Sequence, residues 1–382
     1  MNRRKLGKTG YEVSEIGLGT WQLGESFGAL NDETAQDILK TARRLEVNFW
    51  DTADVYGGGQ SESRIGAFKD KKGVHVATKL GRGSQFPGMK GYTRTHVKES
   101  LTGSLKRIGG ETLDLAQLHC IPTDVLADGE IFTIMDDLRD EGLLRHWGAS
   151  VENVEEALIC LKAEGVATLQ IIFNLFRQDY AEEVLPKAAK QNVGIIVRLP
   201  LASGLLSGKW NKDTTFAATD HRNFNANGEK FNVGETFSGL PFEKGVAFAE
   251  QIKQMAPNYP LSQFALRWIL DQPAVSTIIA GVTRPDQLKA NVDATKREPV
   301  EPKLAEELAG WYQEKATPLS KGRPAKVSPT LKNLPSRLKL RWSFSSNLVS
   351  LVHLPESSPE ASGRRTMMPT FCFCALGSTS VA

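Results

Sequence analysis

Two kinds of segment alternate along residues 1–315 of the 382-residue chain. Short runs rich in apolar and β-branched residues predict buried strands, and longer stretches with apolar residues at helical spacing predict amphipathic helices. The predicted strands are 14–19, 47–52, 74–80, 113–119, 146–150, 169–175, 194–200 and 275–282. The predicted helices include 32–45, 95–107, 153–164, 180–191 and 261–270.

This alternation points to an α/β fold. Eight strand–helix units in about 300 residues indicate a parallel sheet and favour a (β/α)8 barrel, although periodicity alone leaves an open doubly wound sheet as the alternative. Before the first strand, Arg3–Val13 carries Gly7 and Gly10 at turn positions and predicts a hairpin across the barrel floor. After the seventh strand, residues 202–243 form a long connection, which is typical of a functional lid or of disorder.

The pattern ends at Ala316. The last 67 residues hold twelve serines and seven prolines, with no sustained strand or helix period. We therefore predict a domain over 1–315 and a disordered tail over 316–382. The tail is basic, with nine Lys/Arg against two Asp/Glu, so a net charge of +3 for the whole chain leaves about −4 for the domain.

Composition narrows the functional classes. The chain is 40% hydrophobic and 24% charged, which is typical of a soluble globular protein. No apolar run approaches the roughly 18 residues of a transmembrane helix, no secretory signal opens the chain, and the domain has no basic cluster suited to nucleic acid. Four cysteines, including Cys372 and Cys374, make neither a disulfide framework nor a usual zinc site. These features predict a cytoplasmic protein without a metal.

Four polar residues stand where strands of a barrel would end. Asp51 closes the second predicted strand, Tyr56 follows in its loop, and Lys79 and His119 end the third and fourth strands. Each has a structural alternative: a rim aromatic for the tyrosine, a snorkelling lysine, a buried core histidine and a turn-capping aspartate. Because the carboxyl ends of barrel strands share one mouth, their joint occurrence favours a catalytic group.

Together the four side chains suit acid catalysis. A tyrosine has a reference pKa of about 10, and a nearby ammonium favours the phenolate and lowers that pKa. A carboxylate would keep the lysine charged and in place, while a neutral histidine can donate a hydrogen bond to a substrate oxygen. The group fits proton delivery to an oxygen that is becoming an alkoxide. No metal-ligand cluster accompanies it.

Over residues 3–315 the chain resembles the aldo-keto reductases. Five motifs occur in the family's order: Leu6-Gly-Lys-Thr-Gly10, Ile16-Gly-Leu-Gly-Thr-Trp21, Phe49-Trp-Asp-Thr-Ala-Asp-Val-Tyr-Gly57 with Ser61-Glu62, Thr78-Lys79 and Leu118-His119. The resemblance implies that Tyr56 is the general acid and that Lys79 lowers its pKa. It also implies that Asp51 anchors the lysine and that His119 orients the carbonyl.

The resemblance further implies a cofactor, NADPH, extended across the barrel mouth. The chain accordingly lacks a Gly-x-Gly-x-x-Gly motif between a strand and a helix. Ser150 and Gln170 match the residues that grip the nicotinamide carboxamide. The stretch around the pyrophosphate is matched by Pro200, Leu201, Ser203, Gly204 and Lys209, and the segment at the adenosine end by Gly281, Thr283, Arg284, Gln287 and Asn291. The first-strand motif and the seventh strand add Gly19, Thr20, Trp21 and Arg198.

Within the adenosine segment, Thr283 and Arg284 stand at a predicted helix start, where a 2′-phosphate would be favoured. The alternative for Arg284 is an ordinary exposed charge. Two positions depart from the family pattern near the nicotinamide. Val151 replaces an asparagine, and Arg198 replaces an aromatic ring, although a planar guanidinium can also stack. The tail after residue 315 also differs from the family's usual C-terminal loop.

The sequence is compatible with three functions. The first is an NADP-dependent oxidoreductase that reduces a small aldehyde or ketone to an alcohol. The second, also implied by the resemblance, is an NADPH-binding regulatory subunit of a membrane channel or other partner. The third is a barrel isomerase or aldolase that uses Lys79 as a Schiff-base amine. For the enzyme, Trp21, Tyr56, residues 120–124 and the loop after Ala202 predict a partly apolar, aromatic-lined pocket. The sequence predicts neither the carbonyl compound nor the oligomeric state.

Overall fold

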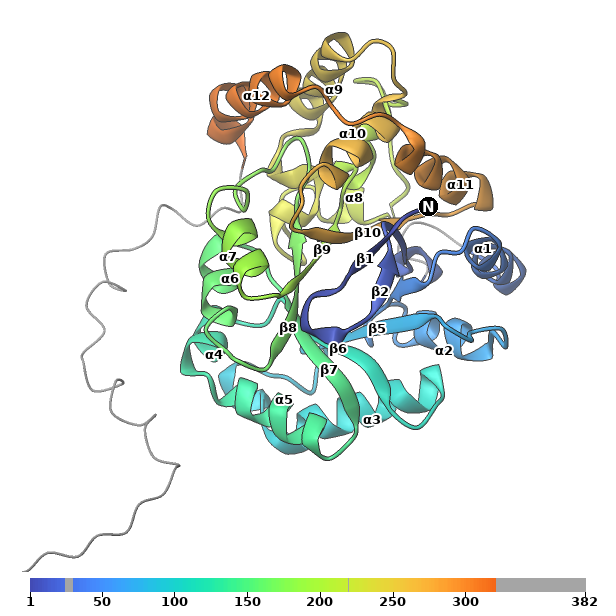
Figure 1. Cartoon of the computed structure of the whole chain (residues 1–382), viewed down its shortest axis with the longest axis vertical. Helices are drawn as coiled ribbons and strands as arrows, with labels where there is room; N and C mark the ends of the chain where they lie inside the picture. The colour runs from blue at the N-terminus through green and yellow to red at the C-terminus, as the bar shows by residue number, and fades with distance from the viewer. Residues whose placement is uncertain (25–29, 219, 321–382) are drawn as a thin grey trace, which may run out of the picture. The chain divides into compact units, whose positions relative to one another are not determined.

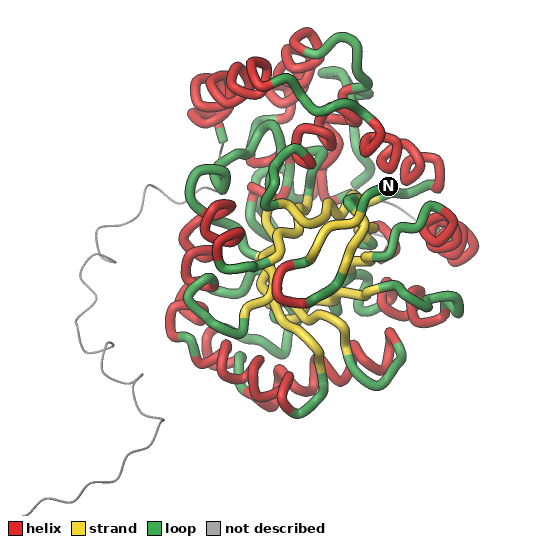
Figure 2. Tube along the Cα trace, viewed as in Figure 1, coloured by secondary structure: helices red, strands yellow, loops and turns green. Residues whose placement is uncertain are grey.

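The computed structural model describes residues 1–24, 30–218 and 220–320. Eight parallel strands close into a barrel in which β10 pairs with both β3 and β9 (Figures 1 and 2). The strands are β3 (Ile16–Gly19), β4 (Phe49–Asp51), β5 (His75–Leu80), β6 (Leu113–His119), β7 (Leu144–Ser150), β8 (Val166–Ile172), β9 (Gly194–Arg198) and β10 (Val275–Gly281). The closed barrel confirms the predicted (β/α)8 fold and excludes the alternative of an open doubly wound sheet.

Helices surround the barrel in Figure 2. They are α1 (Asp32–Arg44), α2 (Gln60–Ala67), α3 (Arg94–Ile108), α4 (Thr123–Asp128), α5 (Glu130–Asp140), α6 (Val154–Cys160), α7 (Val184–Lys190), α8 (His221–Phe224), α9 (Phe242–Met255), α10 (Leu261–Leu270), α11 (Pro285–Asp293) and α12 (Pro302–Trp311). Helix α1 illustrates how the sequence specifies them. The Asn31 side chain accepts from the Thr34 amide, and Ile38, Leu39 and Ala42 are buried on one face.

Seven of the eight barrel strands have limits that differ from prediction, and the path of the chain explains the differences at the first and sixth strands. The first predicted strand began at Ser14, but this residue pairs with Arg3 in an N-terminal hairpin, and the barrel strand begins at Ile16. The sixth strand is predicted at 169–175, whereas β8 lies three residues earlier because the chain turns back at Asn174, whose backbone pairs with Arg177. Gln170 therefore lies in the second half of its strand rather than near its start.

The predicted hairpin consists of β1 (Arg3–Lys5) and β2 (Glu12–Ser14), joined through a 3-10 turn at Gly7–Thr9. It lies across one end of the barrel (Figure 2). The φ of Gly7 is +53°, and a Cβ there would stand 2.1 Å from the Gly194 amide nitrogen, so only glycine allows this approach. Arg4 donates to the carbonyls of Leu270 (2.8 Å), at the end of α10, and of Val275 (2.9 Å), at the start of β10, which fastens the hairpin to both elements.

Apolar side chains fill the barrel beneath this hairpin. We call this cluster the floor layer; its buried members are Leu6, Val13, Phe49, Ala77, Leu115, Ile196 and Ile279. Five of the seven come from barrel strands, and Tyr11 packs against them from the hairpin. The floor layer closes one end of the barrel, so a site that receives ligands must lie at the other end.

The long connection after β9 is folded through most of its length. It holds 3-10 turns at Ala202–Ser207, Val233–Glu235 and Phe237–Gly239 together with α8. Neighbouring aromatic rings hold it together, with centroid separations of 5.0–6.2 Å; these rings are Trp210, Phe216, Phe237 and Phe242. The loop is thus an ordered cover, and it brings Glu235 to the barrel mouth.

The predicted tail over 316–382 falls outside the described residues from position 321 onward. Up to that point the chain continues from α12 through a π-helical turn (Tyr312–Ala316) and a 3-10 turn (Thr317–Leu319). The boundary at 315 therefore stays a prediction. Among the described residues, no helix has the length and apolar character needed to cross a membrane.

Candidate active site

A buried ion pair lies at the carboxyl ends of β4 and β5. The Lys79 ammonium, at the end of β5, pairs with one oxygen of Asp51, at the end of β4, and donates to the Thr52 carbonyl (2.8 Å). The second Asp51 oxygen accepts from the side-chain amides of Gln117 (3.0 Å) and Gln170 (2.8 Å). Buried charges are stable only when paired and hydrogen-bonded, and every one of these partners comes from a strand or the loop that follows it.

Tyr56 lies on the loop after β4 with its hydroxyl 3.3 Å from the Lys79 ammonium. The loop turns through Gly57, whose φ is +60°, and runs against Gly24, where a Cβ would meet the Tyr56 carbonyl carbon at 2.5 Å. Burial raises the pKa of Tyr56, and the positive charge of Lys79 counteracts this by favouring the phenolate. Burial likewise opposes the charge of Lys79, but Asp51 and Tyr56 outweigh it and raise the pKa of the lysine, which is therefore a stable cation.

His119, at the end of β6, faces Tyr56 with the two rings nearly perpendicular and 5.9 Å apart. Burial, followed by the charges of Arg82, Lys79 and Arg198, holds the pKa of His119 well below its usual range. The imidazole is therefore neutral and carries a single N–H donor. Its Nδ1 is buried without a hydrogen-bond partner among the described residues. Such a ring can orient a carbonyl oxygen without itself giving up a proton.

These side chains meet at one cavity of about 80 Å³, which we call the catalytic cavity. Its lining residues include Asp51, Tyr56, His119 and seven of the residues predicted at the cofactor, namely Gly19, Thr20, Trp21, Gln170, Arg198, Pro200 and Gly281. Lys79 lies behind Tyr56, and the Trp21 ring stacks at 5.9 Å from the tyrosine ring. The structure therefore brings together all four residues predicted to be catalytic.

A groove of about 410 Å³ continues from the catalytic cavity and shares Gln22, Leu199, Pro200 and Gly281 with it. Nine predicted cofactor residues line this groove, namely Pro200, Leu201, Ser203, Gly204, Lys209, Gly281, Thr283, Gln287 and Asn291. Where groove and cavity meet, the buried Gln22 Oε1 has no hydrogen-bond partner among the described residues. An extended ligand with hydrogen-bond donors and phosphate groups fits this shape and lining.

Two predicted cofactor residues stand outside both linings. Ser150 is buried on β7, with its hydroxyl 3.4 Å from the Gln170 side-chain oxygen. Arg284 is exposed, and its guanidinium pairs with Asp286 at 3.0 and 3.2 Å, so the structure does not place it in the groove. Val151 stands where the family pattern has an asparagine, and its buried side chain offers no amide group. The backbone carbonyl of Val151 accepts a hydrogen bond from Arg198 at 3.4 Å.

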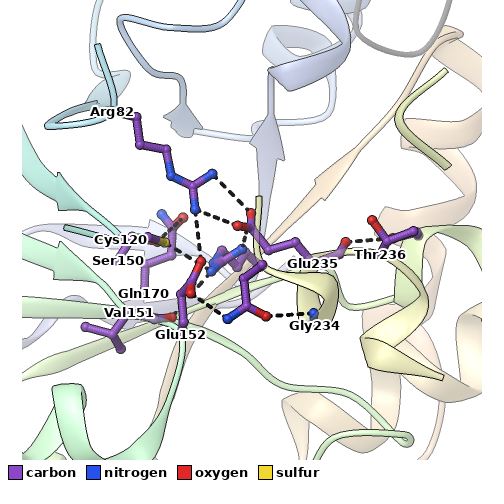
Figure 3. Close-up of polar contacts among 12 residues, drawn as sticks. Arg82, Cys120, Ser150, Val151, Glu152, Gln170, Gly234, Glu235 and Thr236 are labelled. Carbon is purple, nitrogen blue, oxygen red and sulfur yellow. Dashed lines mark hydrogen bonds and ion pairs between the residues drawn. The ribbon is translucent and has the colours of Figure 1, made fainter. Parts of the chain in front are cut away.

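Sequence reasoning missed several polar residues at the mouth. Gln117 could have been found, because it stands two positions before His119 and so shares its face of the strand. Arg82, Glu152 and Glu235 form a charged group (Figure 3), and Glu235 lines the catalytic cavity. Glu235 lies in the long connection, where no period in the sequence indicates which residues point inward. The lining consequently includes more polar residues than the partly apolar, aromatic-lined pocket that the sequence predicts.

Comparison with known proteins places this geometry in context. The model of the Aldo/keto reductase family matches residues 15–310. The aldo-keto reductase YhdN of Bacillus subtilis is 30% identical over 77% of this chain and 89% of its own. A probable voltage-gated potassium channel subunit beta of Oryza sativa is 30% identical over 82% of this chain and 98% of its own. A glycerol dehydrogenase structure from Gluconobacter oxydans superposes with a TM-score of 0.67 at 27% identity, covering 86% and 98% of the two chains.

Proposed function

Because this chain belongs to the aldo/keto reductase family, we propose that it reduces an aldehyde or ketone to an alcohol with NADPH, and that Tyr56 supplies the proton. One observation carries the proposal. Asp51, Tyr56 and His119 line a single cavity, Lys79 contacts both Asp51 and Tyr56, and the cavity adjoins the groove lined by the predicted cofactor residues. A hydride donor in the groove and the proton donor Tyr56 would therefore reach the same carbonyl group.

The groove residues would hold the cofactor. Ser150 and Gln170 would bind the nicotinamide end, Ser203, Gly204 and Lys209 the pyrophosphate, and the segment 281–291 the adenosine end. NADPH, when bound, supplies the hydride. The preference for NADPH over NADH depends on Arg284, whose exposed guanidinium would have to exchange Asp286 for a 2′-phosphate.

The protein's own residues would manage the proton. The neutral His119 N–H donates to the carbonyl oxygen and fixes the orientation of the substrate. As the oxygen becomes an alkoxide, the Tyr56 O–H bond breaks and its proton passes to that oxygen. The Lys79 ammonium, 3.3 Å from the phenolic oxygen, stabilises the resulting phenolate, and Asp51 keeps the ammonium in position.

The two other functions receive no specific support. A Schiff base needs a neutral amine, whereas Lys79 is ion-paired with Asp51 and its pKa is raised. Relatives named as channel subunits occur in this family. Within the part of the chain that the structure describes, no feature points to a channel partner, so the regulatory-subunit function is not proposed.

The decisive test follows NADPH oxidation with para-nitrobenzaldehyde in the wild type and in Tyr56→Phe. We expect turnover to fall by roughly 10²–10⁴-fold, because a positioned general acid contributes about that much. The Kd for NADPH, measured by fluorescence titration, should stay within about twofold since the phenol O–H only donates to substrate.

Tyr92→Phe is the matched control, because the Tyr92 hydroxyl donates to the Gly81 carbonyl at 2.8 Å outside the cavity. Its turnover should equal that of the wild type. Undiminished turnover in Tyr56→Phe would remove the proposed proton donor. A wild type that binds NADPH but reduces no aldehyde would overturn the proposed function itself.

A further inference from the structure

Helix α3 holds the loop that carries Tyr56, residues 52–59, which we call the tyrosine loop. Asp54 stands two residues before Tyr56, and its carboxylate accepts a hydrogen bond from the Ser100 hydroxyl on α3 at 3.0 Å. The Asp54 amide donates to the Lys79 backbone carbonyl at 3.2 Å. Asp54 therefore joins the tyrosine loop both to α3 and to the end of β5, although the proposed reaction gives it no role.

A second residue of α3 holds the far end of the tyrosine loop. Arg107 lies seven positions after Ser100, so both side chains project from one face of the helix. The Arg107 guanidinium pairs at 2.7 Å with Glu62 of the neighbouring helix α2 (Figure 1). It also packs against Gly59, where a Cβ would stand 2.6 Å from the Arg107 Nε. The loop is thus fastened to α3 on both sides of Tyr56.

Several groups act on the charge of the Asp54 carboxyl. Burial has the largest effect and raises the pKa of this carboxyl to about 6. The hydrogen bonds from the Ser100 hydroxyl and the Val55 amide lower the pKa. Of the two charged groups nearby, Glu62 on α2 raises the pKa and Arg107 on α3 lowers it. Asp54 therefore changes its charge just below neutral pH.

Ionised Asp54 lowers the stability of the folded chain. The ordinary pKa of an aspartate is 3.8, so between pH 3.8 and about 6 the folded chain binds more protons than the unfolded chain. The free energy of unfolding therefore falls as the pH rises through that window, and the full cost is present above it. A carboxylate that weakens the fold beside the proposed proton donor needs an explanation other than stability.

We propose that Asp54 is a positioning residue for Tyr56: its carboxylate fixes the tyrosine loop against α3, and protonation of that carboxylate loosens the loop and slows the reaction. This inference rests on the proposed function. The Lys79 ammonium is paired with Asp51, so Asp54 acts through the backbone of the loop. A hydrogen bond to a carboxylate is roughly twice as strong as one to a neutral group, so loss of the charge weakens the contact with Ser100. The Tyr56 hydroxyl is then no longer held 3.3 Å from the Lys79 ammonium, and a small displacement of a catalytic group is costly in rate.

The test is the pH dependence of kcat/KM for para-nitrobenzaldehyde, a neutral substrate, at saturating NADPH. For the wild type we expect kcat/KM to fall by roughly tenfold from about pH 8 to about pH 5, the difference between a charged and a neutral hydrogen bond. Asp54→Asn has the same size and can still accept from Ser100, but it carries no charge. Its kcat/KM should stay near the acid level of the wild type, so the ratio of the two enzymes should change from roughly ten at about pH 8 to roughly one at about pH 5. Because both enzymes meet the same cofactor, this ratio excludes titrations that belong to NADPH.

Melting temperatures separate positioning from a merely structural role. Asp54→Asn removes the cost of the buried charge, so its Tm should exceed that of the wild type. The difference should be larger at about pH 8 than at about pH 5, by roughly 2 °C or more. A variant that is more stable and yet slower supports a positioning role. A variant that loses both stability and turnover would show that Asp54 only supports the fold.

Ser100→Ala tests the other side of the contact. Without the hydroxyl the pKa of Asp54 should rise further, because the hydrogen bond favours the carboxylate. The fall in kcat/KM should therefore begin at a higher pH than in the wild type. Thr102→Ala is the matched control: its hydroxyl donates to the Lys98 carbonyl within α3, and its loss should leave the pH profile in place.

A second carboxylate, Glu152, has its pKa raised to about 7 and could produce a similar profile. Glu152→Gln should keep the fall in kcat/KM at acid pH. If that fall disappeared in Glu152→Gln and persisted in Asp54→Asn, or if Asp54→Asn matched the wild type at about pH 8, the positioning role would be overturned and the proposed function would stand. A wild type that binds NADPH but reduces no para-nitrobenzaldehyde at any pH would instead overturn the proposed function.

Discussion

The same barrel strands build two unlike layers. Inward-facing side chains on β4, β5 and β9 are Phe49, Ala77 and Ile196 in the floor layer. Two residues further along each strand they are Asp51, Lys79 and Arg198, which we call the mouth layer. Because side chains two apart on a strand point the same way, a single step along the barrel axis separates hydrocarbon from buried charge.

This difference separates two tasks. The floor layer gains stability from burial alone, and any apolar residue of similar volume would serve. Charges in the mouth layer are costly to bury and are tolerated only as a connected network of ion pairs and amide hydrogen bonds. Substitutions in the mouth layer should therefore reduce turnover, whereas substitutions in the floor layer should reduce only the free energy of unfolding.

Lys79→Met should have the largest effect. Turnover is expected to fall by about 10²–10⁴-fold or more, because the phenolate of Tyr56 loses its positive partner. The free energy of unfolding should also drop by about 3–5 kcal/mol, since the carboxylate of Asp51 is left buried without its cation. Steady-state kinetics and urea unfolding measure the two effects.

Adding Asp51→Asn to Lys79→Met separates these effects. The double variant should recover much of the stability and none of the turnover. Lys98→Met, which removes an exposed ion pair with Glu141, is the control and should change neither quantity appreciably. If the double variant regained activity, the lysine would have no role beyond holding the fold.

Leu115→Ala tests the floor layer. Leu115 is 1% exposed and packs within the apolar cluster. Removing its side chain should lower the free energy of unfolding by about 2–5 kcal/mol, while kcat per folded molecule stays within about twofold. A fall in kcat as large as that of a mouth variant would show that the two layers are not separable.

Glu152→Gln should have the smallest effect, visible only as a change with pH. The pKa of Glu152 is raised from 4.5 to about 7 in the folded chain. Between those values the folded state binds more protons than the unfolded state, so this residue costs stability as the pH rises through that window. Glutamine cannot ionise and removes the cost.

Melting curves can check this sign. The difference in Tm, variant minus wild type, should be more positive at about pH 8 than at about pH 5, by roughly 2 °C or more. An unchanged difference would show that Glu152 is ionised without penalty. The opposite trend would show that its ion pair with Arg82 outweighs burial.

The sequence predicted most of the fold because the barrel strands carry its strongest signal. The bounds of β6 and α10 agree with prediction: apolar residues are dense throughout β6, and α10 begins directly after Pro260 and carries its apolar residues at helical spacing. The limits of β8 could not be predicted in the same way. Its apolar run continues through Phe173 and Leu175 beyond the end of the strand, and only the tertiary turn at Asn174 stops it.

For the site, strand ends predicted the four proposed catalytic residues, because topology alone brings the carboxyl ends of strands together. Arg284 shows the limit of motif matching. The position lies in the expected segment, but its neighbour Asp286 competes for the guanidinium. Glu235 shows the other limit: its place at the cavity depends on how a loop of about forty residues folds, and local sequence preferences do not determine that.

The fastening of Arg4 to Leu270 and Val275 also bears on synthesis of the chain. The partners in these two contacts are 266 and 271 residues apart in the sequence. Strand β3 likewise gains its second neighbouring strand only when β10 is present. On the ribosome, the first strand therefore remains an unpaired edge until nearly the whole domain has emerged. Such long-range closure slows folding and leaves a strand edge open to misassembly. The hairpin that seals the finished barrel is thus also the part of it that is completed last.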